Sequence, residues 1–342
     1  MSFVKFFVKI FWNHQEKRLR AICRLLLQLL LMTIISAVLS ILLAAILRFD
    51  PRLYASTPET PSFALFMIIS TLITLIAFTS SIWLAGKWFD RRQFKAFGFH
   101  FNSSYFTDFA FGLALGAVLM TIIFLIEWAS GWITIRGTMH SSYPDQPFAT
   151  GLLQTVILFI SVGIYEELYS RGYMLRNLAE GLNLRFIGAR NALILAWVIS
   201  SAIFGALHAG NPNASWISTL NLVVAGLFLG LGFVLTGELA IPIGLHITWN
   251  FFQGNVFGFP VSGTTPIVSF IAINQKGNDL ITGGAFGPEA GLIGLFAIGI
   301  GSVLTVLWVK YRYGQIRLKT ELAQYLTTDK KELENETLAV GE

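Results

Sequence analysis

The segment Glu166-Glu167-Leu168-Tyr169-Ser170-Arg171-Gly172 places two adjacent carboxylates and a guanidinium directly after an apolar run from Leu152 to Ile164. That run has the composition of a membrane helix. A charged side chain in the middle of a bilayer costs about 2.5–3.5 kcal/mol on insertion scales. Three charges in or just below the hydrocarbon layer therefore need partners, and ionisable residues at this depth are candidates for a functional site.

The composition of the whole chain also indicates a membrane protein. Of 342 residues, 54% are hydrophobic and 13% are charged, and the mean hydropathy is +0.65. A soluble protein carries about 25% charged residues. The net charge is +5, but no basic face carries interleaved aromatic residues, so we predict no nucleic-acid partner. The single cysteine, Cys23, excludes an internal disulfide and a zinc site built on cysteine pairs.

Eight segments have the length and apolar character of membrane helices, which need about 20 apolar residues. They are 22–47, 63–86, 107–133, 150–174, 191–209, 217–236, 239–259 and 290–310. The sequence therefore predicts an all-α fold, a polytopic helical bundle with about eight transmembrane helices. The first apolar run is too long for a cleaved signal peptide, and we expect it to be a retained span.

Basic residues fall mainly on one side of this arrangement. Twenty of the 24 Lys and Arg residues lie in the two tails or follow the second and fourth spans. The positive-inside rule then predicts that both termini are cytoplasmic. The other four are Arg48, Arg52, Arg136 and Lys276. We divide the chain into a basic tail (1–21), three helices (22–149), a core of four helices (150–260), a glycine-rich loop with the last helix (261–313) and a charged tail (314–342).

The charges of the opening segment fall into two groups when placed on a helix. Glu167 and Arg171 are four residues apart with the carboxylate on the N-terminal side, which is the favourable order for an ion pair. Glu166 is rotated by about 100° from Glu167, so it points elsewhere. It has no obvious partner on its own helix.

Two histidines also lie within apolar segments, and each has a neighbour at helical spacing. His208 is four residues after Phe204, and His246 is four residues before Asn250. A buried histidine satisfied by a backbone carbonyl is the structural alternative for either one. Together with Glu166, these groups suit amide hydrolysis: a carboxylate as general base, an imidazole that orients water, and two donors for the oxyanion.

The residues resemble the three motifs of the CPBP family, the CAAX proteases and bacteriocin-processing enzymes that are also described as intramembrane glutamic endopeptidases. The EExxxR pattern corresponds to Glu166-Glu167-Leu168-Tyr169-Ser170-Arg171, FxxxH to Phe204-Gly205-Ala206-Leu207-His208 and HxxxN/D to His246-Ile247-Thr248-Trp249-Asn250. The resemblance covers about residues 150–260. Each motif alone is weak, but all three in order on predicted membrane helices are specific. Asp90-Arg91-Arg92 and the Gly-Pro-Glu segment at Pro288 are also similar to bacterial members.

The resemblance implies eight transmembrane helices and proteolysis at a membrane-embedded cavity. Our leading hypothesis is a protease without cofactor or metal. The resemblance also implies that Glu166 is catalytic and is supported by Glu167 and Arg171. His208 helps to activate water, and His246 and Asn250 form the oxyanion hole. The family often has Phe before the Arg, where this chain has Ser170. We expect a membrane-associated peptide or protein substrate (CAAX-type, bacteriocin leader or signalling peptide) and a bacterial cell membrane. The sequence does not indicate an oligomeric state.

Three other functions fit parts of the pattern. A zinc-dependent membrane protease could use the same histidines and a glutamate as ligands, although the HExxH spacing is absent. A non-catalytic bacteriocin-immunity or scaffold protein would have no use for an unpaired Glu166. A transporter could use Glu and His as a proton relay, but no inverted repeat is visible.

The predicted depths of the site residues conflict. At 1.5 Å per residue, Glu166 lies about 12 Å from the inner end of its predicted helix, whereas His208 lies about 25 Å from the inner end of its own. The depths would agree better if the fifth helix began near Trp197, with 175–195 along the membrane interface.

Overall fold

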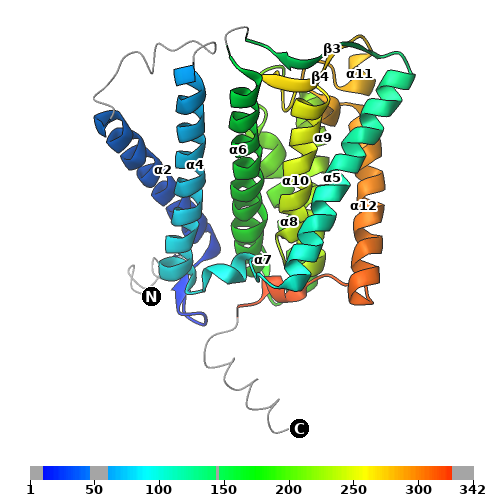
Figure 1. Ribbon diagram of the computed structural model, residues 1–342. Coiled ribbons are helices and arrows are strands. Elements are labelled where there is room, and N and C mark those ends of the chain that lie inside the picture. The colour runs from blue at the N-terminus through cyan, green and yellow to red at the C-terminus, as the bar shows by residue number, and fades with distance from the viewer. Residues whose placement is uncertain (1–10, 47–60, 144–145, 326–342) are drawn as a thin grey trace.

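The computed structural model describes residues 11–46, 61–143 and 146–325. The charge count also included residues outside these ranges: Lys5, Lys9, Arg48, Arg52 and the tail after Tyr325. Within the described residues, seven helices are long and apolar enough to cross a membrane, and they form one bundle (Figure 1). The spans contain α2 (Ala21–Ile46), α4 (Pro61–Ala85), α5 (Ser103–Ala129), α6 (Phe148–Glu167), α8 (Gly188–Leu207), α9 (Trp216–Thr236) and α12 (Leu292–Tyr313).

The seventh predicted span, 239–259, is shorter in the structure than the others. Helix α10 covers Ala240–Phe251 and continues as a π-helical turn, η4, over Phe252–Val256. It replaces the predicted segment 239–259. The prediction of a helical membrane bundle is confirmed, and an intrahelical hydrogen-bond ladder is what a backbone needs where water is absent.

Helix α10 lies unusually close to α5. A Cβ placed on Gly112 would be 2.4 Å from the carbonyl oxygen of Ile241, and one on Gly116 would be 2.6 Å from that of Leu245. On the other side, a Cβ on Gly244 would be 2.4 Å from the carbonyl oxygen of Phe109. Gly112 and Gly116 form the GxxxG spacing that lets membrane helices pack backbone to backbone. This contact positions α10, which carries His246 and Asn250.

Two strands at one end of the bundle were not predicted. Strand β3 (Ile133–Ser141) pairs antiparallel with β4 (Val268–Gln275), from Ile133 opposite Gln275 to Ser141 opposite Val268, with an irregularity after Ile135. The signal was present in Ile-Thr-Ile at 133–135, a β-branched run. The pair lies at the end of the bundle away from the described ends of the chain (Figure 1), together with α11 (Asp279–Thr282) and η5 (Pro288–Ala290). These segments belong to the glycine-rich loop region.

The other end of the bundle holds the short strands β1 (Trp12–Asn13) and β2 (Arg18–Leu19), the turns η1 (Gly86–Asp90) and η2 (Phe94–Phe97), and η6 (Thr320–Ala323). Here the amide of Asn183 donates to the carbonyl of Ala323 at 2.8 Å. The first and last described segments also meet here, where the guanidinium of Arg18 lies over the ring of Tyr325. Arg136 on β3 and Lys276 after β4 lie at the opposite end of the bundle.

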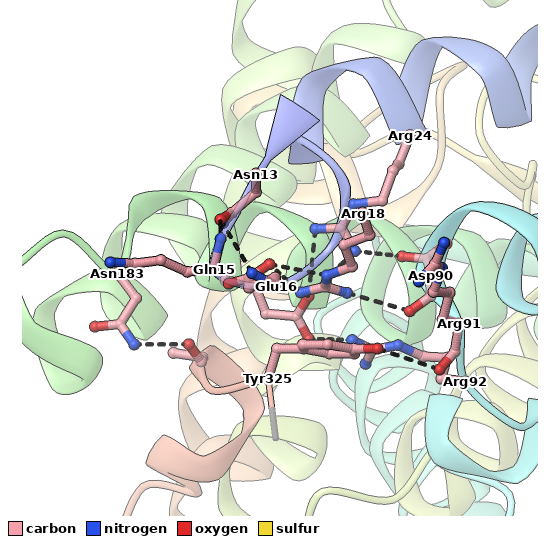
Figure 2. A network of polar contacts seen from close by, with 12 residues as sticks. Asn13, Gln15, Glu16, Arg18, Arg24, Asp90, Arg91, Arg92, Asn183 and Tyr325 are labelled. Atoms are coloured by element: carbon pink, nitrogen blue, oxygen red, sulfur yellow. Dashed lines mark hydrogen bonds and ion pairs between the residues drawn. The ribbon is translucent and has the colours of Figure 1, made fainter. Parts of the chain in front are cut away.

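A buried network of charges ties these segments together (Figure 2). Its centre is Glu180 in α7 (Arg176–Leu182), whose carboxylate pairs with Arg18 at 2.7 Å, with Arg24 at 3.3 Å and with Arg92. Asp90 accepts a second bond from Arg24 at 2.6 Å. The guanidinium of Arg18 lies 3.4 Å from the ring centroid of Tyr325. Each buried charge has an opposite partner, as burial requires.

Candidate active site

The glutamate pair lies where an α-helix changes into a π-helix. Glu166 and Glu167 end α6, and a π-helix, η3, runs from Leu168 to Leu175 before α7 begins. The wider turn buries Arg171, which is 1% exposed. Short π-helical segments inside helices are frequent at functional sites.

Glu167 is the centre of the polar contacts. Its Oε1 accepts from Nη1 of Arg171 at 2.9 Å and from Nδ1 of His246 at 2.8 Å. The first contact is the ion pair that the spacing predicts. The second joins α6 to α10 and was not predicted, because sequence spacing reports only neighbours on the same helix.

Arg171 is held by three groups. Besides Glu167, its Nη2 donates to the carbonyl oxygen of Gly226 in α9 at 3.0 Å. Its guanidinium also lies 4.5 Å from the ring centroid of Phe204, a cation–π distance. The Phe204 ring contacts His208 in turn, at a centroid separation of 4.7 Å. Phe204 thus connects the buried charge pair to the histidine four residues later.

Hydrogen bonds define which nitrogen of each histidine is free. Nδ1 of His208 lies 2.8 Å from the carbonyl oxygen of Phe204, and Nδ1 of His246 lies 2.8 Å from Glu167. Carbonyl and carboxylate oxygens only accept, so both Nδ1 atoms donate. Each histidine keeps Nε2 for other partners. A neutral His208 therefore offers an acceptor at Nε2, while His246 can donate from Nε2 only as an imidazolium.

One cavity of about 690 Å³ is lined by Glu166, His208, His246 and Asn250. Glu166 lies at the end of α6, His208 directly follows the last residue of α8, and His246 and Asn250 lie in the second half of α10. In the described part of the chain, the Glu166 carboxylate makes no hydrogen bond or ion pair. Glu167 and Arg171 do not line the cavity but lie buried behind it, at 0% and 1% exposure. Four of the six predicted residues thus line the cavity. The other two, Glu167 and Arg171, bind each other, and Glu167 also binds His246 of the cavity wall.

The predicted conflict of depths has a structural explanation. The fourth helix does not end near residue 174 but continues through η3 and α7 to Leu182. Glu166 is therefore 16 residues, or about 24 Å at 1.5 Å per residue, before that end. Helix α8 begins at Gly188, so the suggested start near Trp197 is wrong. His208 then lies about 30 Å from the start of α8, and both residues reach the same cavity.

A small recess of about 50 Å³ is lined by two polar residues that the motifs do not include. Ser262 and Glu289 line it together with His208, His246 and Asn250. The only sequence signal for Glu289 was the Gly-Pro-Glu segment. Among the described residues, no group of three or more His, Cys, Asp and Glu side chains is spaced to hold a metal ion.

A family model matches part of the chain. The family model described as "Type II CAAX prenyl endopeptidase Rce1-like" matches residues 148–252, from the start of α6 into η4. This stretch contains all six predicted site residues, and the resemblance to the CAAX protease family is confirmed over it. No curated protein and no solved structure shows a match to the chain.

Proposed function

We propose that this protein is an intramembrane endopeptidase that hydrolyses peptide bonds of membrane-associated peptides or proteins, with Glu166 as the general base. One observation carries the proposal: Glu166, His208, His246 and Asn250 from three helices line a single cavity. The family match supports a membrane protease in general terms. The roles of the individual residues are our inference from their chemistry, their contacts and the resemblance to the family motifs.

The first step is attack by water. Glu166 takes a proton from a water molecule as the water oxygen bonds to the carbonyl carbon of the peptide. His208 orients this water through Nε2, the ring nitrogen that its bond to Phe204 leaves as an acceptor. General-base catalysis of this kind contributes about 10²–10⁴-fold.

The resulting oxyanion needs donors. Asn250 supplies an amide N–H, and His246, whose Nδ1 donates to Glu167, supplies Nε2–H when both of its ring nitrogens carry protons. One oxyanion-hole donor is worth about 2.7–4 kcal/mol in a known protease. Arg171 fixes Glu167 from the other side.

The intermediate then collapses. Glu166 returns its proton to the departing nitrogen as the C–N bond breaks, giving a carboxylic acid and an amine. One water is consumed, and Glu166 is again ionised.

The cavity wall supports a substrate with an apolar segment. Much of the lining is aliphatic, and α2 contributes Leu25, Leu29 and Met32. We further propose that the end of the bundle with both described chain ends is cytoplasmic, because the basic residues gather there.

The proposal is tested by comparing the new peptide termini in membranes that contain wild-type protein or Glu166→Gln. This substitution keeps size and hydrogen bonding but removes the base. We expect a set of cleavages that requires Glu166. A variant that produces the same termini as the wild type would refute the proposal.

The zinc-dependent alternative uses the same histidines and is separated by chelation. Activity that survives exhaustive chelation refutes a zinc mechanism. Activity that is lost and then restored by added Zn²⁺ refutes the metal-independent one.

A further inference from the structure

A tight turn after α10 forms part of the site wall. It comprises Val261–Thr264, and its half-buried Ser262 lines both the large cavity and the small recess beside His208 and Asn250. Ser262 lies at φ +47°. This left-handed conformation is strained for a residue other than glycine and persists only where surrounding structure imposes it.

The turn is closed by its own backbone and by the following loop. Val261 and Thr264 exchange two N–H to carbonyl hydrogen bonds, each of 2.9 Å. The N–H of Gly263 donates to the carbonyl oxygen of Phe286 at 2.7 Å. A Cβ on Gly263 would lie 1.7 Å from the carbonyl oxygen of Pro212, so the turn also lies directly against the loop after α8.

That loop, which follows His208, satisfies the remaining carbonyl groups. The side-chain amide of Asn211 donates to the carbonyl oxygen of Ser262 at 3.0 Å, and that of Asn213 donates to the carbonyl oxygen of Gly263 at 3.1 Å. The turn is thereby tied to the segment that carries a proposed active-site histidine.

Glu289 accepts a hydrogen bond from the N–H of Ser262, the one backbone donor of the turn not yet accounted for. Its Oε1 accepts from the N–H of Ser262 at 2.6 Å, and its other oxygen accepts from the side-chain amide of Gln253. Gln253 also donates to the carbonyl oxygen of Pro260 at 2.5 Å. Glu289 is 4% exposed, and burial raises the pKa of its carboxyl to about 7 although these donors lower it. The Glu289 carboxyl group is thus held by several donors in a buried place that disfavours its charged form.

Every N–H and carbonyl group of the turn is now used within the protein. No backbone group of the turn is therefore left to hydrogen-bond a substrate. The part of the turn that a substrate can contact is the Ser262 side chain. The adjoining recess, about 50 Å³, has room for only a few water molecules at about 10–15 Å³ each. Apart from its polar members it is lined by apolar side chains such as Phe228 and Leu245.

We propose that the Val261–Thr264 turn is a fixed specificity wall that restricts the recess to a small apolar substrate side chain next to the cleaved bond. Ser262 sets the size limit, and Glu289 is the positioning residue that holds it. This inference rests on the proposed protease function and names the substrate feature that the site selects.

Two substitutions change the size of the side chain at position 262 and remain compatible with its positive φ. Ser262→Gly removes the side chain, and Ser262→Asn enlarges it; glycine and asparagine are the residues that best tolerate a positive φ. The full-length protein in detergent is given a peptide library from a digested proteome, and cleavage sites absent with Glu166→Gln are read by mass spectrometry. Met139→Gly is the matched control, because Met139 also has a positive φ (+50°) but is exposed on β3.

We expect the wild type to favour small side chains at one position beside the cleaved bond. Ser262→Gly should shift the preference toward larger side chains by about 10-fold or more, the usual effect of one methylene in a pocket. Ser262→Asn should narrow the range of side chains accepted at this position, and Glu289→Gln should broaden that range. Met139→Gly should leave the range unchanged. Identical profiles for wild type, Ser262→Gly and Ser262→Asn would overturn the specificity wall. A wild type with no Glu166-dependent cleavage would instead refute the protease function itself, and this inference with it.

Discussion

At the scale of single residues, the two glutamates have different surroundings. Glu167 is fully buried and bound by Arg171 and His246, whereas Glu166 faces the cavity. The sequence predicted this division from helical rotation. It could not predict that the same Glu167 oxygen also binds His246, because that contact depends on how α6 and α10 pack.

Glu167→Gln should destabilise the protein strongly. It leaves the buried Arg171 guanidinium without its counter-charge, and breaking a buried pair costs about 3–5 kcal/mol. Thermal unfolding in detergent measures this loss. The matched control is Glu321→Gln, which breaks the exposed i,i+4 pair with Arg317 at 3.4 Å, and exposed pairs are worth about 0–1 kcal/mol. Equal melting temperatures for the two variants would contradict the assigned role of Glu167.

At the scale of elements, most spans could be predicted, since a long apolar run can satisfy its backbone in lipid only as a helix. The first six predicted spans and the last correspond to helices of the structure. The continuation from α6 through η3 to α7 was missed, because residues 175–182 carry charges that pair only in the fold, Glu180 with Arg18, Arg24 and Arg92. The β3–β4 pair was missed because its strands are more than 120 residues apart.

The contact between α5 and α10 gives a prediction at this scale. Gly116→Ala puts a methyl group 2.6 Å from the carbonyl oxygen of Leu245, so α10 must move and displace His246 and Asn250. A misplacement of about 1 Å can cost about 10²-fold in rate, and we expect a loss of that order in kcat. Gly299→Ala is the control, since a Cβ there meets no atom within 4 Å. Normal turnover by folded Gly116→Ala would contradict the positioning role of this contact.

At the scale of the whole molecule, the bundle has two chemically different ends. One carries the buried arginine network and both described chain ends, and the other carries β3, β4 and η5 (Figures 1 and 2). The charge count predicted which segments share an end. It could not show that Glu180 and Asp90 lie among the arginines and neutralise part of their charge.

Membrane orientation can be tested with single cysteines in a Cys23→Ser background. Met139, 63% exposed on β3, and Arg317, with 55% of its side chain exposed, lie at opposite ends. We expect an impermeant maleimide to label Met139→Cys in intact cells, and Arg317→Cys only after permeabilisation. The reverse pattern would invert the proposed topology.

The central claim is that Glu166 is the base of a metal-independent peptide hydrolysis. The most direct measurement compares kcat/KM of purified wild type and Glu166→Gln on one Glu166-dependent peptide after exhaustive chelation. We predict an active wild type and a variant at least about 10²-fold slower, the lower bound for a general base. A variant as fast as the wild type, or a wild type that is inactive until Zn²⁺ is restored, would contradict the account.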